Sequence, residues 1–201
     1  MSRDISDSLV EAALSSLAVA IDIETTGLDF NTDKIASVQV GVASGPIEIV
    51  RFDHDIDRPE NIISLLESRR VLKVFHHAMF DLRFMRTAWG AVPEHVACTK
   101  VASKIVDPTG EVGHRLVDLA RYYLGVEIDK SEQTSDWLSS TLTTEQIAYA
   151  ANDVRHLVPL LYALLSDLRH QGLERLALRC FDHLPTRVEL EVHEFGDVFT
   201  Y

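Results

Sequence analysis

The chain has 201 residues, of which 46% are hydrophobic and 25% are charged, and its formal net charge is −12. This size favours one domain, residues 1–201, with a sizeable core. No apolar run approaches the roughly 18 residues that a membrane span requires, so we expect no membrane contact. The negative charge argues against a protein that grips a long nucleic acid, because each bound phosphate normally takes a lysine or an arginine.

The charge is unevenly distributed along the chain. Residues 69–130 carry ten basic and seven acidic side chains, whereas the segments before and after them are strongly acidic. An anion would therefore be bound by this middle segment, with contacts to only a few phosphates. The polar first residues lack the apolar core of a signal peptide, and Cys98 and Cys180 lack a CxxC spacing. We therefore expect a cytoplasmic protein with reduced cysteines.

Hydrophobic spacing predicts a lead-in helix over residues 4–17 and then three strands in meander order. The strands are rich in β-branched residues and are separated by turn sequences; they are predicted at 19–23, 35–42 and 47–52. Strands and helices then alternate, with helices at 59–68 and 79–87 and strands at 71–75 and 95–98. The other predicted helices are 99–105, 115–124, 135–139, 144–151, 154–170 and a segment around 173–181. This order favours an α/β fold with a mixed sheet of five or six strands flanked by helices, and a C-terminal tail over residues 182–201.

Two carboxylates lie one residue apart in the first predicted strand, within the run Ala18-Val-Ala-Ile-Asp-Ile-Glu-Thr-Thr-Gly-Leu28. Residues i and i+2 of a strand project from one face, so Asp22 and Glu24 point to the same place. Alone, the pair fits a strand end whose acids reach solvent as well as it fits a divalent-metal site.

Two later segments carry acids that bear on this choice. Asp81 opens a helix directly after a predicted strand, where an acid also serves as a structural cap that interacts well with the helix dipole. Tyr149 and Asp153 are spaced i and i+4, so they share one helix face. Asp153 lies among apolar residues, where an unpaired acid is unfavourable to bury. Tyr149 taken alone would be an ordinary core aromatic.

Together these segments form the pattern Asp-x-Glu on a first strand, Phe-Asp at a strand-to-helix junction and Tyr-x-x-x-Asp on a late helix. In this pattern the chain resembles the DEDD exonuclease superfamily, in its tyrosine branch of RNase D-like enzymes. Four further motifs are similar to the compact bacterial nanoRNase C group, which degrades dinucleotides and very short RNA. They are Cys98-Thr-Lys-Val-Ala-Ser-Lys104, His114-Arg-Leu, Gln133-Thr-Ser-Asp-Trp137 and Phe181-Asp-His-Leu-Pro-Thr-Arg187.

The resemblance implies a ribonuclease H-like fold, a requirement for Mg²⁺ or Mn²⁺, and degradation in the 3′-to-5′ direction. It also implies a ring-shaped homo-oligomer, octameric in the resembling group, for which the C-terminal tail would supply contacts. His77 stands where the tyrosine branch often has an asparagine.

The chemistry expected of such a site explains the need for cations. Four carboxylates at one point repel one another by roughly 4 kcal/mol per close pair at an effective dielectric near 20. Two Mg²⁺ or Mn²⁺ ions would offset this repulsion and bridge the scissile phosphate. In this hypothesis Asp22, Glu24 and Asp153 are direct ligands, and Asp81 holds a metal through water. Tyr149 would orient the attacking water or help to deprotonate it; a tyrosine pKa near 10 favours orientation.

Candidate substrate contacts begin at the end of the first strand, with Thr25. Gly27 lets the chain turn close to a ligand. Leu28 would wedge against the terminal base, as its counterpart does in the resembling group, although a strand-ending turn with a core leucine fits equally well. His76 and His77 fall on opposite sides of a continuing strand, so at most one of them is expected to face the site.

The other substrate candidates lie later in the chain. Ser103 and Lys104 match the short-substrate motif of the resembling group and fall in the basic middle segment. Trp137 would belong either to the core or to the rim of the site. Gln133 would touch either the substrate or only the backbone.

Three functions are therefore compared. The leading hypothesis is a metal-dependent 3′–5′ exoribonuclease that hydrolyses very short RNA, dinucleotides above all, to nucleoside 5′-monophosphates. The acidic surface supports it, because few phosphates need to be neutralised. The alternative is an RNase D-like exonuclease that trims longer RNA or single-stranded DNA, for which a broader basic groove is expected. A non-catalytic nucleic-acid-binding scaffold would be expected to lack at least one acid, and all four acids are present.

Overall fold

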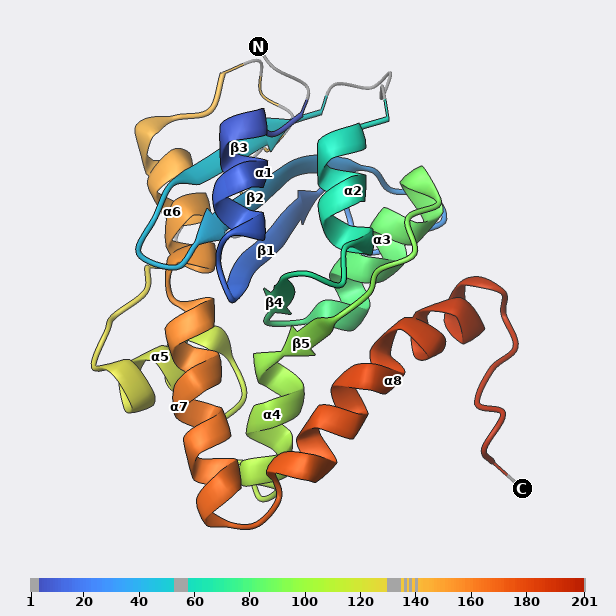
Figure 1. Ribbon diagram of the computed structural model, residues 1–201. Coiled ribbons are helices and arrows are strands. Elements are labelled where there is room, and N and C mark those ends of the chain that lie inside the picture. Colours follow the sequence, from blue (N-terminus) through green and yellow to red (C-terminus); the bar gives the residue numbers. More distant parts are fainter. Residues whose placement is uncertain are drawn as a thin grey trace.

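The computed structural model describes residues 4–52, 58–129, 135, 137, 139 and 141–200. Its centre is a five-stranded sheet with the strand order β3-β2-β1-β4-β5 (Figure 1). The strands are β1 (Ala18–Thr25), β2 (Ile35–Val42), β3 (Ile47–Arg51), β4 (Leu72–Phe75) and β5 (Val96–Cys98). The first three pair antiparallel, whereas β4 runs parallel to both β1 and β5. The predicted mixed sheet is confirmed, with five strands.

Helices cover the sheet and continue beyond one end of it. They are α1 (Asp7–Leu14), α2 (Glu60–Glu67), α3 (Ala78–Trp89), α4 (Thr99–Val106), α5 (Leu116–Leu124), α6 (Thr144–Arg155), α7 (Leu157–His170) and α8 (Glu174–Val192). Helix α6 packs on β1, β2 and β3, and α7 packs on β1 and β4. Helix α8 lies against β5, α3 and α4. The C-terminus of the chain, which follows α8, lies far from α6 (Figure 1).

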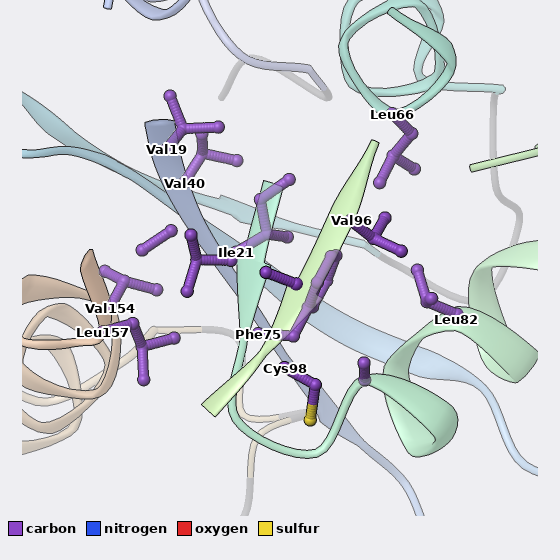
Figure 2. Packing of buried hydrophobic residues seen from close by; sticks show 14 of the residues in the cluster. Val19, Ile21, Val40, Leu66, Phe75, Leu82, Val96, Cys98, Val154 and Leu157 are labelled. Carbon is purple, nitrogen blue, oxygen red and sulfur yellow. The ribbon is translucent and has the colours of Figure 1, made fainter. Parts of the chain in front are cut away.

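The core forms on both sides of the strands. Figure 2 shows Leu66 of α2 and Leu82 of α3 on one side, and Val154 of α6 and Leu157 of α7 on the other. All four side chains are buried. Burial of a leucine contributes roughly 1.5–3 kcal/mol, so this packing holds α3 and α6 firmly against the sheet. Within the described residues, no helix has both the length and the apolar character to cross a membrane.

The first turn of α6 is defined by a capping box. The Oγ1 atom of Thr143 accepts a hydrogen bond from the backbone N–H of Gln146 at 3.1 Å. In return, the side-chain oxygen of Gln146 accepts one from the backbone N–H of Thr143 at 2.9 Å. A capping box satisfies two donors that the helix itself leaves free, so α6 begins at a definite residue.

The predicted elements are found with small shifts, except near the C-terminus and at residues 135–139. The helix predicted around residues 173–181 continues through Pro185 to Val192. A proline inside a helix removes one hydrogen bond and usually ends or bends the helix. Here the second half of α8 is held on α3 by ion pairs, which local sequence does not reveal. For the helix predicted at 135–139, the described residues are Ser135, Trp137 and Ser139, and none of them is helical.

Candidate active site

Asp22 and Glu24 lie on the same face of β1, directly opposite Gln39 and Ser37 of β2. Ile21 and Ile23, which alternate with them, are buried in the core. Because side chains alternate along a strand, both acids point away from the apolar core. Both side chains remain partly exposed. As the sequence predicted, the two carboxylates share one face.

Helix α6 brings a third acid to this place. One carboxylate oxygen each from Asp22, Glu24 and Asp153 lies within 4.8 Å of the others. Asp153 is only 5% exposed. At such distances like charges repel by roughly 3–4 kcal/mol per pair at an effective dielectric near 20. Three carboxylate oxygens this close are the ligand set that a hard divalent cation prefers.

Asp81 lies in the first turn of α3, immediately after β4, and its side chain is 2% exposed. Burial raises the pKa of Asp81 to about 7, and hydrogen bonds from the backbone at Asp81 and at Ile23 of β1 partly oppose this rise. Within the described part of the chain, its Oδ2 atom is buried without a hydrogen-bond partner. A carboxylate oxygen in this state is unfavourable unless something binds it. This atom, next to β1, therefore fits a site that takes up a hydrated cation.

Tyr149 lies one helical turn before Asp153 and is 6% exposed. Its ring packs against Trp137, with centroids 5.8 Å apart. Burial raises the pKa of Tyr149 well above its ordinary value, and the negative charges of Asp153 and Glu24 raise it further. The hydroxyl hydrogen-bonds to Asp153, which also keeps it protonated. At neutral pH this group is therefore a hydrogen-bond donor rather than a base.

The acids border a cleft of about 670 Å³. Asp22, Glu24, Tyr149 and Asp153 contribute to its lining, whereas Asp81 is buried behind it. The other lining residues are Ile23, Thr25, Thr26, Gly27, Leu28, His76, His77, Phe80, Arg83, Leu116, Ser135 and Trp137. A cleft of this size with convergent polar groups is typical of a small-molecule or nucleotide site.

Comparison with known proteins gives the family. Residues 2–169 match a family model described as 3′-5′ exonuclease. The chain belongs to the 3′–5′ exonuclease family. The chain is 34% identical to NrnC of Brucella melitensis, with a TM-score of 0.88, and the match covers 94% of the chain and 92% of NrnC. NrnC has also been solved with bound Mg²⁺ and bound to pGG. The expected membership of the RNase D-like branch, near NrnC, is confirmed.

Curated relatives of the chain are longer proteins. Ribonuclease D of Cronobacter turicensis is 34% identical over 113 residues, which are 54% of the chain and 29% of that relative. DNA polymerase I of Aquifex aeolicus is 34% identical over 159 residues, which are 78% of the chain and 25% of the polymerase. The matches thus span between a quarter and a third of the length of these two relatives.

The loop after β1 in the exonuclease holds Leu28 at the cleft. Asp33 fixes the loop by accepting a hydrogen bond from the backbone N–H of Asp29 at 2.9 Å. A side chain at Gly27 would place its Cβ 2.4 Å from the Asp33 carboxylate, so this carboxylate would have to move away from its place in the loop. Thr25 closes the turn by donating to the carbonyl of Gly27 at 2.6 Å. Leu28 is 83% exposed, so it is not a core leucine.

The expectation that at most one of His76 and His77 faces the site is wrong, because both line the cleft. Strand β4 ends at Phe75, so the alternation of the strand does not extend to these histidines. His76 is fixed by Thr99 Oγ1, 2.8 Å from its Nδ1, and by the carbonyl of His114, 3.1 Å from its Nε2. His77 stacks on Phe80; burial and then the charges of nearby cations lower its pKa.

Two further substrate candidates, Ser103 and Lys104, are not among the residues that line the cleft. Ser103 is buried, and its hydroxyl contacts the carbonyl of Lys100 at 2.9 Å and Nδ1 of His114 at 3.1 Å. Lys104 is exposed on α4 outside the lining. Gln133 lies outside the described residues.

Sequence reasoning missed two polar residues opposite the first acids, Ser37 and Gln39, which are both fully buried. The side-chain amide of Gln39 donates to Ser37 Oγ at 2.7 Å. The signal was present, because two polar residues spaced i and i+2 interrupt an otherwise apolar strand, as Asp22 and Glu24 do. Phe80 and Arg83 were missed as well, although they lie on α3 with Asp81.

Proposed function

We propose that the exonuclease is a metal-dependent 3′–5′ exoribonuclease that hydrolyses very short RNA, dinucleotides above all, to nucleoside 5′-monophosphates. The observation that carries the proposal is the meeting of three carboxylates within 4.8 Å, beside the cleft. The family supplies the reaction class. The short-substrate preference is supported by the pGG complex of NrnC and by the net charge of −12, which disfavours long polyanions.

The residues present fit a pair of Mg²⁺ or Mn²⁺ ions. Asp22, Glu24 and Asp153 would be direct ligands. Oδ2 of Asp81, which has no hydrogen-bond partner among the described residues, would accept a hydrogen bond from a coordinated water. When bound, such cations supply positive charge that activates a water and stabilises charge developing on the phosphate. The chain itself contributes the positioning: β1 fixes Asp22 and Glu24, and the capped α6 fixes Asp153.

The cleft residues have separate parts in this proposal. The hydroxyl of Tyr149, held in its protonated form, orients the attacking water. Leu28 packs against a base, and Thr25, Gly27, His76, His77 and Trp137 shape the space around the substrate. Ser103, outside the lining, would act through His114, whose carbonyl holds the ring of His76, and Lys104 would contribute only its positive charge.

The substrate preference is tested with end-labelled RNAs of two to twenty nucleotides, in Mg²⁺, in Mn²⁺ and in chelator. We expect turnover of the dinucleotide to exceed that of the twenty-mer by about tenfold or more, since the cleft takes few nucleotides and the surface repels a longer strand. Chelator should abolish both activities. Equal rates, or preference for the longer strand, would instead favour an RNase D-like enzyme that trims longer RNA or single-stranded DNA.

We further propose that the exonuclease forms a homo-oligomer, an octamer as in the resembling group. Support comes from the segment after α8, where Phe195, Val198 and Phe199 are each more than half exposed. Clustered exposed apolar side chains mark interaction surfaces. Light scattering should give a multiple of the 22.5 kDa chain mass, and a monomer would contradict this assembly.

The free thiols of Cys98 and Cys180 support a cytoplasmic location.

A further inference from the structure

Arg83 is a cation in the wall of the cleft. It lies on α3, two residues after Asp81, and its side chain is 25% exposed. Among the described residues that line the cleft, it is the only lysine or arginine. The same lining also carries Asp22, Glu24 and Asp153. A phosphodiester that approaches these acids therefore meets one fixed positive charge within the same cleft.

Three contacts hold the guanidinium of Arg83 in place. Its Nε donates to the carbonyl of Met79 at 2.8 Å, and its Nη1 donates to Glu191 of α8 at 2.9 Å. Its Cζ lies 5.0 Å from the centre of the Phe30 ring, which follows Leu28 in the loop after β1. Neither hydrogen bond uses the two N–H groups of Nη2. A guanidinium that is pre-oriented in this way loses little conformational freedom when it binds a phosphate.

The neighbouring Arg86 gives a direct contrast. It also joins α3 to α8, but it donates two hydrogen bonds to the carboxylate of Glu189. Its Nε lies 2.5 Å from Oε1, and its Nη2 lies 3.2 Å from Oε2. Arg86 does not line the cleft. An arginine whose only role is to link two helices by an ion pair would be expected to use this bidentate geometry. Arg83 has a carboxylate on Nη1 alone, and it faces the cleft.

We propose that Arg83 binds a phosphate of the substrate strand, and that Glu191 and Phe30 are positioning residues for its guanidinium. The inference rests on the proposed function for the nature of the substrate. Helix α8 lies beyond residues 2–169, which match the family model. The C-terminal helix thus takes part in substrate recognition through Arg83, in addition to packing against β5.

The kinetic test compares Arg83→Ala with Arg86→Ala, because each variant loses one ion pair between α3 and α8. Arg83→Ala should raise the KM for pGG on the order of tenfold with little change in kcat, as expected for loss of a charge-assisted hydrogen bond. Arg86→Ala should change KM by less than about twofold, since it does not reach the cleft. Arg83→Lys, which keeps the charge but loses the planar fork, should be intermediate. Equal KM values for the two alanine variants would overturn the proposal.

A binding measurement separates this proposal from the proposed function. Retention of ³²P-labelled pGG is measured with Ca²⁺ in place of Mg²⁺, so that no turnover is needed. We expect Arg83→Ala to weaken binding on the order of tenfold relative to both the wild type and Arg86→Ala. If the wild type binds pGG but hydrolyses no RNA, only the proposed function fails. If Arg83→Ala binds as tightly as Arg86→Ala, or if pGG does not bind the wild type at all, the role of Arg83 is refuted.

The positioning role of Glu191 is tested with a double-mutant cycle between Glu191 and Arg83. Glu191→Gln should raise the KM for pGG severalfold in the wild-type background and should have no further effect in the Arg83→Ala background. An effect of equal size in both backgrounds would show that Glu191 acts only through the general packing of α8.

Discussion

Asp153→Asn is expected to lower kcat/KM for a dinucleotide in Mg²⁺ by about 10³-fold or more. The substitution keeps the shape of the side chain but removes one of three charges that meet within 4.8 Å, and cation binding depends on those charges. Calorimetric titration with Mn²⁺ should show correspondingly weaker metal binding. The fold should persist: without metal the melting temperature should equal or exceed that of the wild type, because a repulsion of several kcal/mol is relieved.

Glu145→Gln is the matched control, since Glu145 is an exposed acid in the first turn of the same helix. It should leave kcat/KM within about twofold of the wild type. If Asp153→Asn retained both activity and metal affinity, Asp153 would not be a ligand. The non-catalytic scaffold reading would then regain support.

Tyr149→Phe is expected to lower kcat on the order of 10²-fold while KM stays within about threefold. The hydroxyl is lost, but the ring still packs on Trp137, so the wall of the cleft is preserved. Steady-state kinetics on a dinucleotide with saturating Mg²⁺ measure both constants.

Tyr162→Phe provides the comparison, because Tyr162 is half exposed on α7, away from the cleft. It should have no effect on either constant. A kcat of Tyr149→Phe equal to that of the wild type would assign Tyr149 to the core alone, which is the role that its sequence position taken alone favours.

Two short-range periodicities predicted which of the central residues share a face, and the resemblance to the DEDD pattern predicted that they form one site. Asp22 and Glu24 share a strand face because they are two residues apart, and Tyr149 and Asp153 share a helix face because they are four apart. These periodicities hold wherever the strand and the helix are placed. The structure gathers these residues at one cleft. The mixed sheet was predicted from the order of strands and helices along the chain.

Other features of the fold and the site depended on where a strand or helix ends and on contacts between residues far apart in the sequence. The expectation that at most one of His76 and His77 faces the site was wrong because it extended the alternation of the strand past Phe75, where both the predicted and the observed strand end. The length of α8 depends on ion pairs with α3, and Glu191 lies 108 positions from Arg83. No local pattern reports such a partner, so neither the extent of α8 nor the position of Arg83 at the cleft could be predicted.

The capping box at the start of α6 has a consequence for how this enzyme can diverge. Each residue added to or removed from a helix rotates everything after it by about 100°. With the first turn fixed by Thr143 and Gln146, an insertion or deletion of one residue before Tyr149 would swing both Tyr149 and Asp153 out of the cleft. We expect natural relatives to vary freely in side chains on the exposed face of α6. They should conserve the number of residues between the cap and Asp153.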